Sequence, residues 1–220
     1  MWAQECSRYE LSSMRRFSFI LRDRVATTAI MLMVVCAVVF IWRSLERPEV
    51  PTFIPTVTTP AEVGIEQDAR TVTVDASDPE VWRFFDFSRG SVVEVPGAEE
   101  WDIAFRRFQI IANGGRGMEG QAGATSLEDM TFESVSSVPE TGYVMAERSD
   151  SVNAVLEDWY NYSFTSHLLE PKPIVYAIRT ADGRYAKLEI LGYYCVGVLP
   201  GCTTFRYVYQ GGGGVDVISN

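Results

Sequence analysis

The sequence predicts a mainly β fold, an antiparallel, sandwich-like domain tethered by one N-terminal transmembrane helix. Three observations predict it. Apolar and uncharged residues run unbroken from Val25 to Trp42. From residue 70 onward, short segments alternate polar and apolar residues, as half-buried strands do. Glycine turns such as Asn113-Gly114-Gly115 separate several of these segments. The predicted parts are a cytoplasmic tail, a transmembrane helix, a proline-rich linker, a β domain and a glycine-rich tail, at 1–24, 25–42, 43–69, 70–210 and 211–220.

Charge is distributed unevenly along the 220 residues, whose net charge is −10. Residues 1–50 hold seven arginines against five acidic residues, whereas residues 51–220 hold 12 basic and 24 acidic residues. The second region, with a net charge of −12, is long enough to bury one core. Binding of nucleic acid requires a cationic surface, so we expect no nucleic acid partner.

The uncharged segment 25–42 has the length of a transmembrane helix, which needs roughly 17–25 apolar residues. Arginines flank it on both sides, and Trp42 lies where an interfacial aromatic residue anchors a helix. A buried helix of a soluble core is the alternative, but such helices rarely lack a polar face over this length. A cleaved signal peptide is disfavoured because the segment is long and Phe40-Ile41-Trp42 is unsuitable for cleavage.

Arginine counts predict the orientation of this helix. Five arginines precede the segment and two follow it within the first 50 residues. The positive-inside rule then places the N-terminus in the cytoplasm and the β domain in the periplasm of a bacterial inner-membrane protein. Prolines 48, 51, 55 and 60 in the linker disfavour a helix or an internal strand, so we expect an extended spacer that holds the domain off the membrane.

The β domain is expected to contain eight strands in chain order. They are Arg70–Ala76, Val81–Phe87, Ser91–Val95, Trp101–Ala112, Trp159–Phe164, Ile174–Thr180, Arg184–Tyr194 and Thr203–Tyr209. Asp182-Gly183 predicts a tight hairpin between two of them. Ser151–Asp158 is the one helix predicted outside the membrane, and Gly211–Gly214 is expected to form a flexible tail.

The four cysteines divide by predicted compartment. Cys6 would be cytoplasmic and Cys36 embedded in lipid, so both are expected to be free thiols. Cys195 and Cys202 lie outside the membrane, where thiols oxidise, and a turn-forming Val-Gly-Val-Leu-Pro-Gly segment separates them. We predict a disulfide between them. A metal site is the less favoured alternative, because no second cysteine pair or paired histidine accompanies them.

No motif in the sequence predicts catalysis, so we expect a protein that is not an enzyme. The glycine-rich segment 114–123 follows a predicted strand but lacks the lysine of a phosphate-binding loop. The acidic pairs, such as Glu99-Glu100, are adjacent in sequence, and their side chains therefore diverge on a strand or helix. Histidine-based catalysis has a single candidate, His167, without an evident partner.

Two blocks of the sequence resemble the HmuY family of secreted haem-binding proteins. One is Trp101-Asp102-Ile103-Ala104-Phe105 with Asn113-Gly114-Gly115; the other is Tyr185-Ala186-Lys187-Leu188 with Thr204-Phe205-Arg206-Tyr207. The resemblance covers about residues 70–210. It implies an all-β fold with a finger-like pair of loops that grips haem.

The resemblance also implies axial ligands for haem iron. The best-known members of the family use two histidines, and some relatives use methionine, whereas this chain contains only His167. The candidate cofactor-binding residues are therefore His167 and Met118, with Met130 and Met145 as alternatives to the latter. The competing interpretation is that His167 lies in a loop and the methionines fill the core.

Three functions remain open from the sequence. The leading hypothesis is a non-catalytic accessory subunit of a large membrane complex, with residues 1–42 contacting integral membrane subunits. The chain resembles an accessory subunit of a bacterial photosynthetic reaction-centre–light-harvesting complex, which implies periplasmic partners that include a cytochrome for the β domain. No intrinsic cofactor is then expected, and contacts of the helix with pigment or lipid are peripheral. The alternative is a membrane-tethered haem-binding protein of HmuY type, and a sensor or adhesion module is a weaker third hypothesis.

Overall fold

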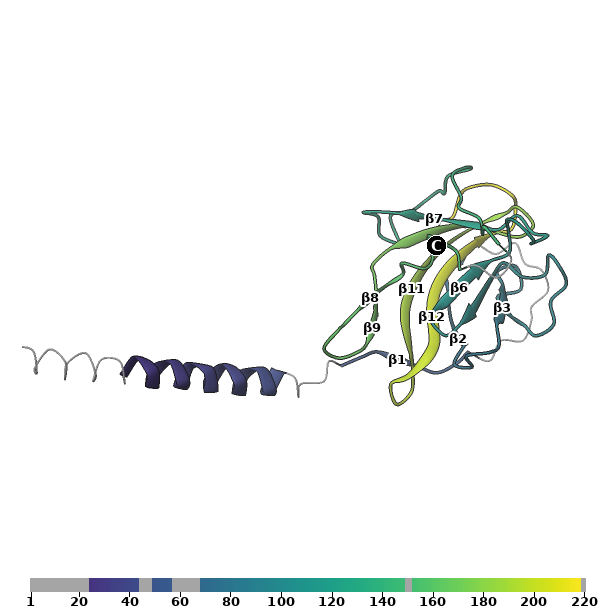
Figure 1. The fold of residues 1–220 in the computed structure, drawn as a ribbon. Coiled ribbons are helices and arrows are strands. Elements are labelled where there is room, and N and C mark those ends of the chain that lie inside the picture. The colour runs from purple at the N-terminus through teal and green to yellow at the C-terminus, as the bar shows by residue number, and fades with distance from the viewer. Residues whose placement is uncertain (1–23, 44–48, 57–67, 149–151, 219–220) are drawn as a thin grey trace, which may run out of the picture. The chain divides into compact units, whose positions relative to one another are not determined.

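The computed structural model describes residues 24–43, 49–56, 68–148 and 152–218 (Figure 1). The chain divides into an N-terminal unit that ends at Pro48 and a β unit that begins at Glu49. Within the N-terminal unit, one helix of 20 residues, Arg24–Arg43, is long and apolar enough to cross a membrane. This helix is compatible with a membrane anchor or a signal sequence. The predicted tail before Arg24 and residues 57–67 of the linker lie outside the described residues.

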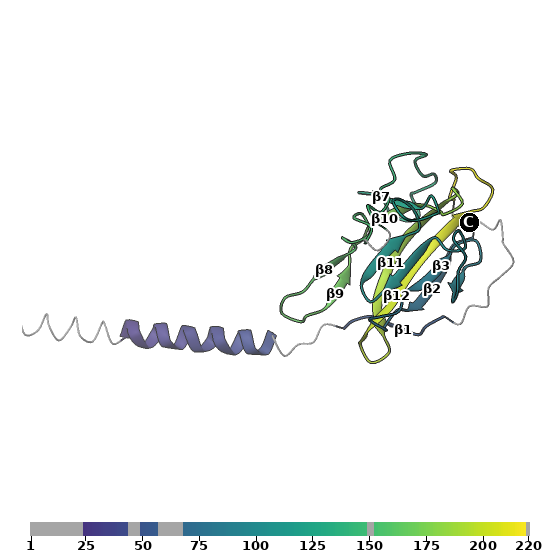
Figure 2. The same cartoon turned by 45° about the vertical axis from the view of Figure 1, so that its right-hand side comes forward.

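The described residues of the β unit form three sheets, whose strands are antiparallel apart from one short strand. The largest has the order β2 (Arg70–Asp75), β12 (Leu199–Gln210), β11 (Tyr185–Cys195), β10 (Val175–Arg179) and β7 (Gly123–Leu127), with β1 (Thr52–Phe53) parallel to β11. The second has the order β4 (Ser91–Val93), β3 (Arg83–Asp86), β5 (Ile103–Arg106) and β6 (Gln109–Ala112). The third is a hairpin of β8 (Tyr160–Tyr162) and β9 (Leu169–Pro171). Figure 2 shows β2, β12 and β11 side by side. The predicted mainly β, antiparallel class is confirmed.

Aromatic side chains join the two larger sheets. Phe85 of β3 and Phe105 of β5 belong to the second sheet, and their ring centroids lie 5.1 and 5.3 Å from that of Phe205 on β12. All three side chains are buried. The contacts are edge-to-face for Phe85 and stacked for Phe105. The sheets therefore pack face to face through an aromatic core, as the sandwich-like prediction requires.

The predicted strand Trp101–Ala112 is in fact two strands. β5 and β6 pair with each other, and Arg107 and Phe108 form the turn between them. Arg107 adopts a φ of 55°, its backbone N–H donates to the Ala76 carbonyl, and its guanidinium donates to the Ser77 carbonyl. These contacts come from a distant part of the chain, so the local pattern did not reveal the turn.

The predicted helix Ser151–Asp158 is wrong for the described residues of that segment. Asn153 caps a single turn, because its Oδ1 accepts from the N–H groups of Val155 and Leu156. The turn continues only to the bond from the Glu157 N–H to the Asn153 carbonyl, and the chain then enters Trp159 and β8.

Part of the predicted linker is folded into the β unit. β1 pairs with the end of β11, and the Phe53 ring lies so close to Gly192 that a Cβ there would be 2.2 Å from it. The Thr56 N–H then donates to the Thr73 carbonyl on β2, and the Thr73 N–H donates to Thr56 Oγ1. Residues 50–56 are thus a strap that joins the β11 edge to β2. The expectation of a free spacer fails for this strap because an edge pairing requires only a few unblocked backbone groups.

The C-terminal segment is also folded. Val217 is fully buried, and its N–H donates to the Ser136 carbonyl. The Val138 N–H donates to the Val215 carbonyl, and the Gln210 side chain donates to the Asp216 carbonyl. The described part of the predicted flexible tail therefore returns to the second hydrophobic cluster of the domain.

Candidate functional site

The β8–β9 hairpin carries the only histidine of the sequence. Two contacts hold its base against the rest of the domain. The Leu169 N–H donates to the Tyr194 hydroxyl at 2.7 Å, and the indole N–H of buried Trp159 donates to the Phe108 carbonyl at 2.9 Å. Trp159 and Tyr194 belong to the main hydrophobic core, and Leu169 packs against it. The hairpin is therefore a projection with a firmly held base.

The imidazole of His167 is oriented by its own hairpin. The His167 N–H donates to the Ser163 carbonyl at 2.8 Å, and the residue adopts a φ of 57°. Nδ1 is hydrogen-bonded to the Tyr162 hydroxyl. Metal-binding histidines are commonly oriented by such a bond at the nitrogen that does not bind the metal. When Nδ1 carries the proton and donates to Tyr162, the Nε2 lone pair is available to a ligand.

Exposed aromatic rings flank this imidazole. The ring centroids of Tyr162 and Phe164 lie 5.9 and 6.2 Å from that of His167. Tyr162 is 53% exposed and Phe164 is 83% exposed, values that are unusual for large apolar groups. At the base of the hairpin, Phe108 and Tyr160 make a further edge-to-face contact. The hairpin thus offers one oriented imidazole and an aromatic surface that suits a flat, apolar ligand.

Met118 lies in a different part of the domain. It packs against a small cluster of Trp101, Ala104 and Ile111. Ala104 and Ile111 alternate with the core-facing residues of β5 and β6, so the cluster covers the face of the second sheet that is opposite the main core. No contact among the described residues joins Met118 to His167. The two residues named together as ligand candidates therefore occupy separate surroundings.

The residues that carry the family resemblance have structural roles in this chain. Asp102 lies between the two large sheets, where its Oδ2 accepts from the Phe87 N–H and its Oδ1 accepts from the Ala181 N–H, both at 2.8 Å. The Asn113 amide donates to the Trp101 carbonyl at 2.8 Å. A Cβ at Gly114 would lie 2.0 Å from the Ala122 carbonyl oxygen. The motif therefore holds the sheets together and does not form the candidate site.

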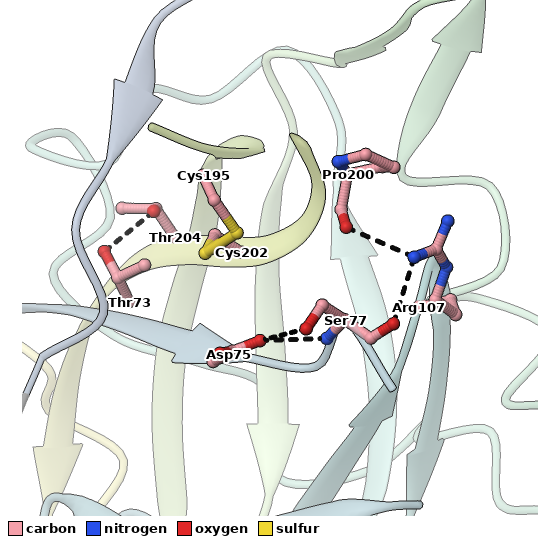
Figure 3. Close-up of a disulfide and its surroundings, with 8 residues drawn as sticks. All are labelled: Thr73, Asp75, Ser77, Arg107, Cys195, Pro200, Cys202 and Thr204. Carbon is pink, nitrogen blue, oxygen red and sulfur yellow. Dashed lines mark hydrogen bonds between the residues drawn. A yellow bond between two sulfur atoms is a disulfide. The ribbon is translucent and has the colours of Figure 1, made fainter. Parts of the chain in front are cut away.

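The predicted disulfide is present between Cys195 and Cys202, whose Cα atoms are 4.9 Å apart (Figure 3). It closes the β11–β12 hairpin near its tip. Asp75 lies beside the sulfur atoms, but its Oδ1 accepts from the Ser77 N–H and hydroxyl. A cysteine binds metals strongly as its thiolate, and sulfur in a disulfide is not a thiolate. The disulfide Cys195–Cys202 therefore serves as a cross-link between β11 and β12.

These features define a class: a two-sheet, antiparallel β domain with an aromatic hairpin that presents one imidazole. The family model of the HmuY protein matches residues 78–207, which is more than half of the chain. The chain belongs to the HmuY family. Among curated proteins, no sequence matches the chain significantly.

Solved structures share the fold. A protein described as HmuY-like and haem-binding, from Bacteroides vulgatus, is 22% identical, with a TM-score of 0.52 over 66% of this chain and 93% of its own. A protein described as a lipoprotein from Bacteroides fragilis is 20% identical, with a TM-score of 0.54 over 74% and 98%. The apo HmuY analog of Tannerella forsythia is 20% identical, with a TM-score of 0.51 over 64% and 95%. At these identities the likeness establishes the fold alone.

Proposed function

We propose that this chain is a membrane-anchored haem-binding protein, in which His167 supplies the axial ligand from the β8–β9 hairpin. Family membership supports the proposal, as does the description of the B. vulgatus relative as a haem-binding protein. The observation that carries it is the hydrogen bond between Tyr162 and Nδ1 of His167, beside two exposed aromatic rings.

The residues of the hairpin have distinct roles in this proposal. Nε2 of His167 would bind the iron, and Tyr162 holds the imidazole ring in position and supports its basicity through Nδ1. Tyr162 and Phe164 would offer aromatic surface to the haem. Met118 serves packing, since its contacts lie on the outer face of the second sheet. His167 would thus be the residue of the hairpin that holds the haem iron.

The test is a titration of ferric haem into the full-length chain in mild detergent, followed by the Soret band. His167→Ala should weaken binding at least tenfold and shift the band, and Tyr162→Phe should weaken binding about tenfold by removing the orienting bond. Met118→Leu is the matched control, because it removes the sulfur and keeps the side-chain volume. It should bind as the parent does.

The opposite pattern contradicts the proposal. If His167→Ala retains the parent affinity and spectrum, His167 is not the ligand. If Met118→Leu alone loses the band, the sulfur is the ligand and the outer face of the second sheet is the site.

A second candidate is the accessory subunit of a membrane complex that the sequence favoured. One observation supports it: Arg24–Arg43 exposes apolar side chains along its whole length, a surface that other membrane helices could cover. The relatives found by comparison give no support to a photosynthetic partner. Purification in mild detergent separates the candidates, since an accessory subunit should be recovered in a fixed ratio to other membrane proteins.

A further inference from the structure

Exposed apolar residues gather at one end of the β unit. The tips of the β8–β9 and β11–β12 hairpins point toward the same end in both views (Figures 1 and 2). On the second of these tips, Val196 is 60% exposed and Leu199 is 63% exposed. Ile54, which follows the pairing of Phe53 with Cys195, is also exposed. Single exposed apolar residues are ordinary, whereas a group at one end of a domain marks a contact surface.

The β11–β12 tip lacks charge in a strongly acidic domain. Residues 196–201 contain no acidic or basic side chain, although residues 51–220 carry a net charge of −12. Val198 is 45% exposed and has a φ of 60°. This conformation is unfavourable for a β-branched residue, and glycine or asparagine would adopt it at a lower cost. The tip therefore exposes apolar side chains, and it carries valine at a position where the backbone conformation favours glycine or asparagine.

The end that carries these residues is rigid. The disulfide Cys195–Cys202 closes the tip, and the Arg107 guanidinium donates to the Pro200 carbonyl at 3.3 Å (Figure 3). The Tyr194 hydroxyl, one residue before the disulfide, accepts the bond from Leu169 of the neighbouring hairpin. A rigid apolar end presents its side chains without a further loss of conformational entropy on contact.

A short covalent segment joins the candidate membrane helix to the β unit. The helix ends at Arg43, and the β unit begins at Glu49. A chain gains at most about 3.6 Å per residue, so the five intervening residues span roughly 20 Å at full extension. The strap formed by residues 50–56 then joins directly to the β11–β12 hairpin. If the helix crosses the bilayer, Glu49 is therefore tethered within roughly 20 Å of the end of the helix, and the strap that follows Glu49 pairs with the end of β11.

We propose that the β11–β12 tip, with Ile54, inserts its apolar side chains into the lipid headgroup region of the leaflet that the helix leaves. The proposal rests on the membrane anchoring put forward above. Lipid is favoured over another protein because the tip is uncharged and offers little area beyond a few aliphatic side chains, whereas a stable protein interface needs a large complementary surface. Zwitterionic lipid suits the contact, since the acidic domain would repel anionic headgroups.

The test places a tryptophan reporter at the tip of the full-length chain. Leu199→Trp is compared with Ile218→Trp after reconstitution into phosphatidylcholine vesicles that contain lipid brominated in the upper acyl chain, a contact quencher. Ile218 is also exposed, but it follows Asp216, which is bonded to Gln210 at the opposite end of β12. The emission of the unaltered chain is subtracted. The chain has five native tryptophans, so a Trp42→Phe variant isolates the emission of Trp42, which lies at the end of the helix and reports insertion of the helix itself.

The expected result is quenching and a blue shift for Leu199→Trp, with the emission added by Ile218→Trp unchanged. Quenching of Trp42 alone would overturn the lipid contact and leave the anchoring intact. If neither Trp42 nor the reporter is quenched, the anchoring fails and the contact fails with it. The haem titration is independent of this readout, so each proposal can fail separately. Shielding of the reporter by a co-purifying protein, without quenching by lipid, would also overturn the contact.

Discussion

The carboxyl group of Asp102 is buried between the two large sheets. Its two oxygens accept backbone N–H groups that follow β3 and β10, so it bridges the sheets directly. Burial raises the pKa of this carboxyl to about 7, against the two backbone hydrogen bonds, which lower it; the nearby carboxyls of Asp86 and Asp182 raise it further. The Asp102 carboxyl therefore holds the two sheets together, while its burial disfavours its ionised form.

The stability of the domain should consequently depend on the protonation of Asp102. Its pKa is raised on folding, so between about pH 4 and pH 7 the folded chain holds a proton that the unfolded chain has released. The free energy of unfolding contributed by this group should therefore fall as the pH rises through that window, by up to about 4 kcal/mol. Urea unfolding of the full chain in mild detergent, followed by near-ultraviolet circular dichroism, measures the change.

Asp102→Asn provides the control for this dependence. The amide cannot ionise, so the slope due to this group should vanish. Stability should also drop by about 1–3 kcal/mol, because an NH₂ group then faces a backbone N–H donor. A pH slope that persists in the variant would assign it to other groups.

At the residue scale, sequence alone could identify His167 as a candidate because it is the only histidine. It could not identify Tyr162 as its partner. The hydrogen bond depends on the register of β8 against β9 and on the left-handed backbone of His167, and neither has a local signature. Residue type alone marks Met118 as a candidate haem ligand. The structure shows that it packs on the outer face of the second sheet, which residue type does not reveal.

At the scale of elements, the glycine-rich turn after β6 shows why the family motif Asn113-Gly114-Gly115 requires glycine at two positions. The backbone of Ala122 lies so close to Gly114 that a side chain at this position has no room. Gly115 has a φ of 107°, and a Cβ there would lie 2.1 Å from the Ala146 carbonyl oxygen. The turn thus brings three backbone segments together at van der Waals limits.

Gly114→Ala should therefore destabilise the domain by at least about 2 kcal/mol, since the new methyl group meets backbone atoms that cannot rotate away. Gly214→Ala is the matched control, because Gly214 is exposed and its nearest neighbour would be a side-chain atom at 3.9 Å. Thermal or urea unfolding of the two variants measures the difference. Equal stability of both variants would show that the turn can relax.

The elements also show where pattern reasoning succeeds. Alternation predicted β2 and β11 to within one residue at each end, and the Thr203–Tyr209 part of β12, because each of these strands has one face on the core. It missed β1, β7 and β9, which are short or lack alternation and exist through pairing with distant strands. The strap and the C-terminal segment were assigned to linker and tail for the same reason: proline and glycine suppress the local signal, and the contacts that order them are long-range.

At the scale of the whole molecule, we expect a membrane anchor with its N-terminus in the cytoplasm. The helix Arg24–Arg43 has the required length and composition, and more arginines precede the apolar segment than follow it. Protease added to intact spheroplasts of a bacterial host should therefore digest the β domain and leave an N-terminal tag protected. Protection of the β domain, with loss of the tag, would reverse the orientation. Recovery of the β domain in the soluble fraction would show that the segment is cleaved.

We propose above all that the chain carries haem on the β8–β9 hairpin. The most direct measurement is the absorption spectrum of the full-length chain purified from its native membranes in mild detergent, with protein mass analysis of the same sample. We predict a Soret band in proportion to the chain, and its loss in the His167→Ala variant. A sample without a haem Soret band would contradict this proposal, and bacteriochlorophyll bands with stoichiometric photosynthetic subunits in that sample would establish the accessory-subunit function instead.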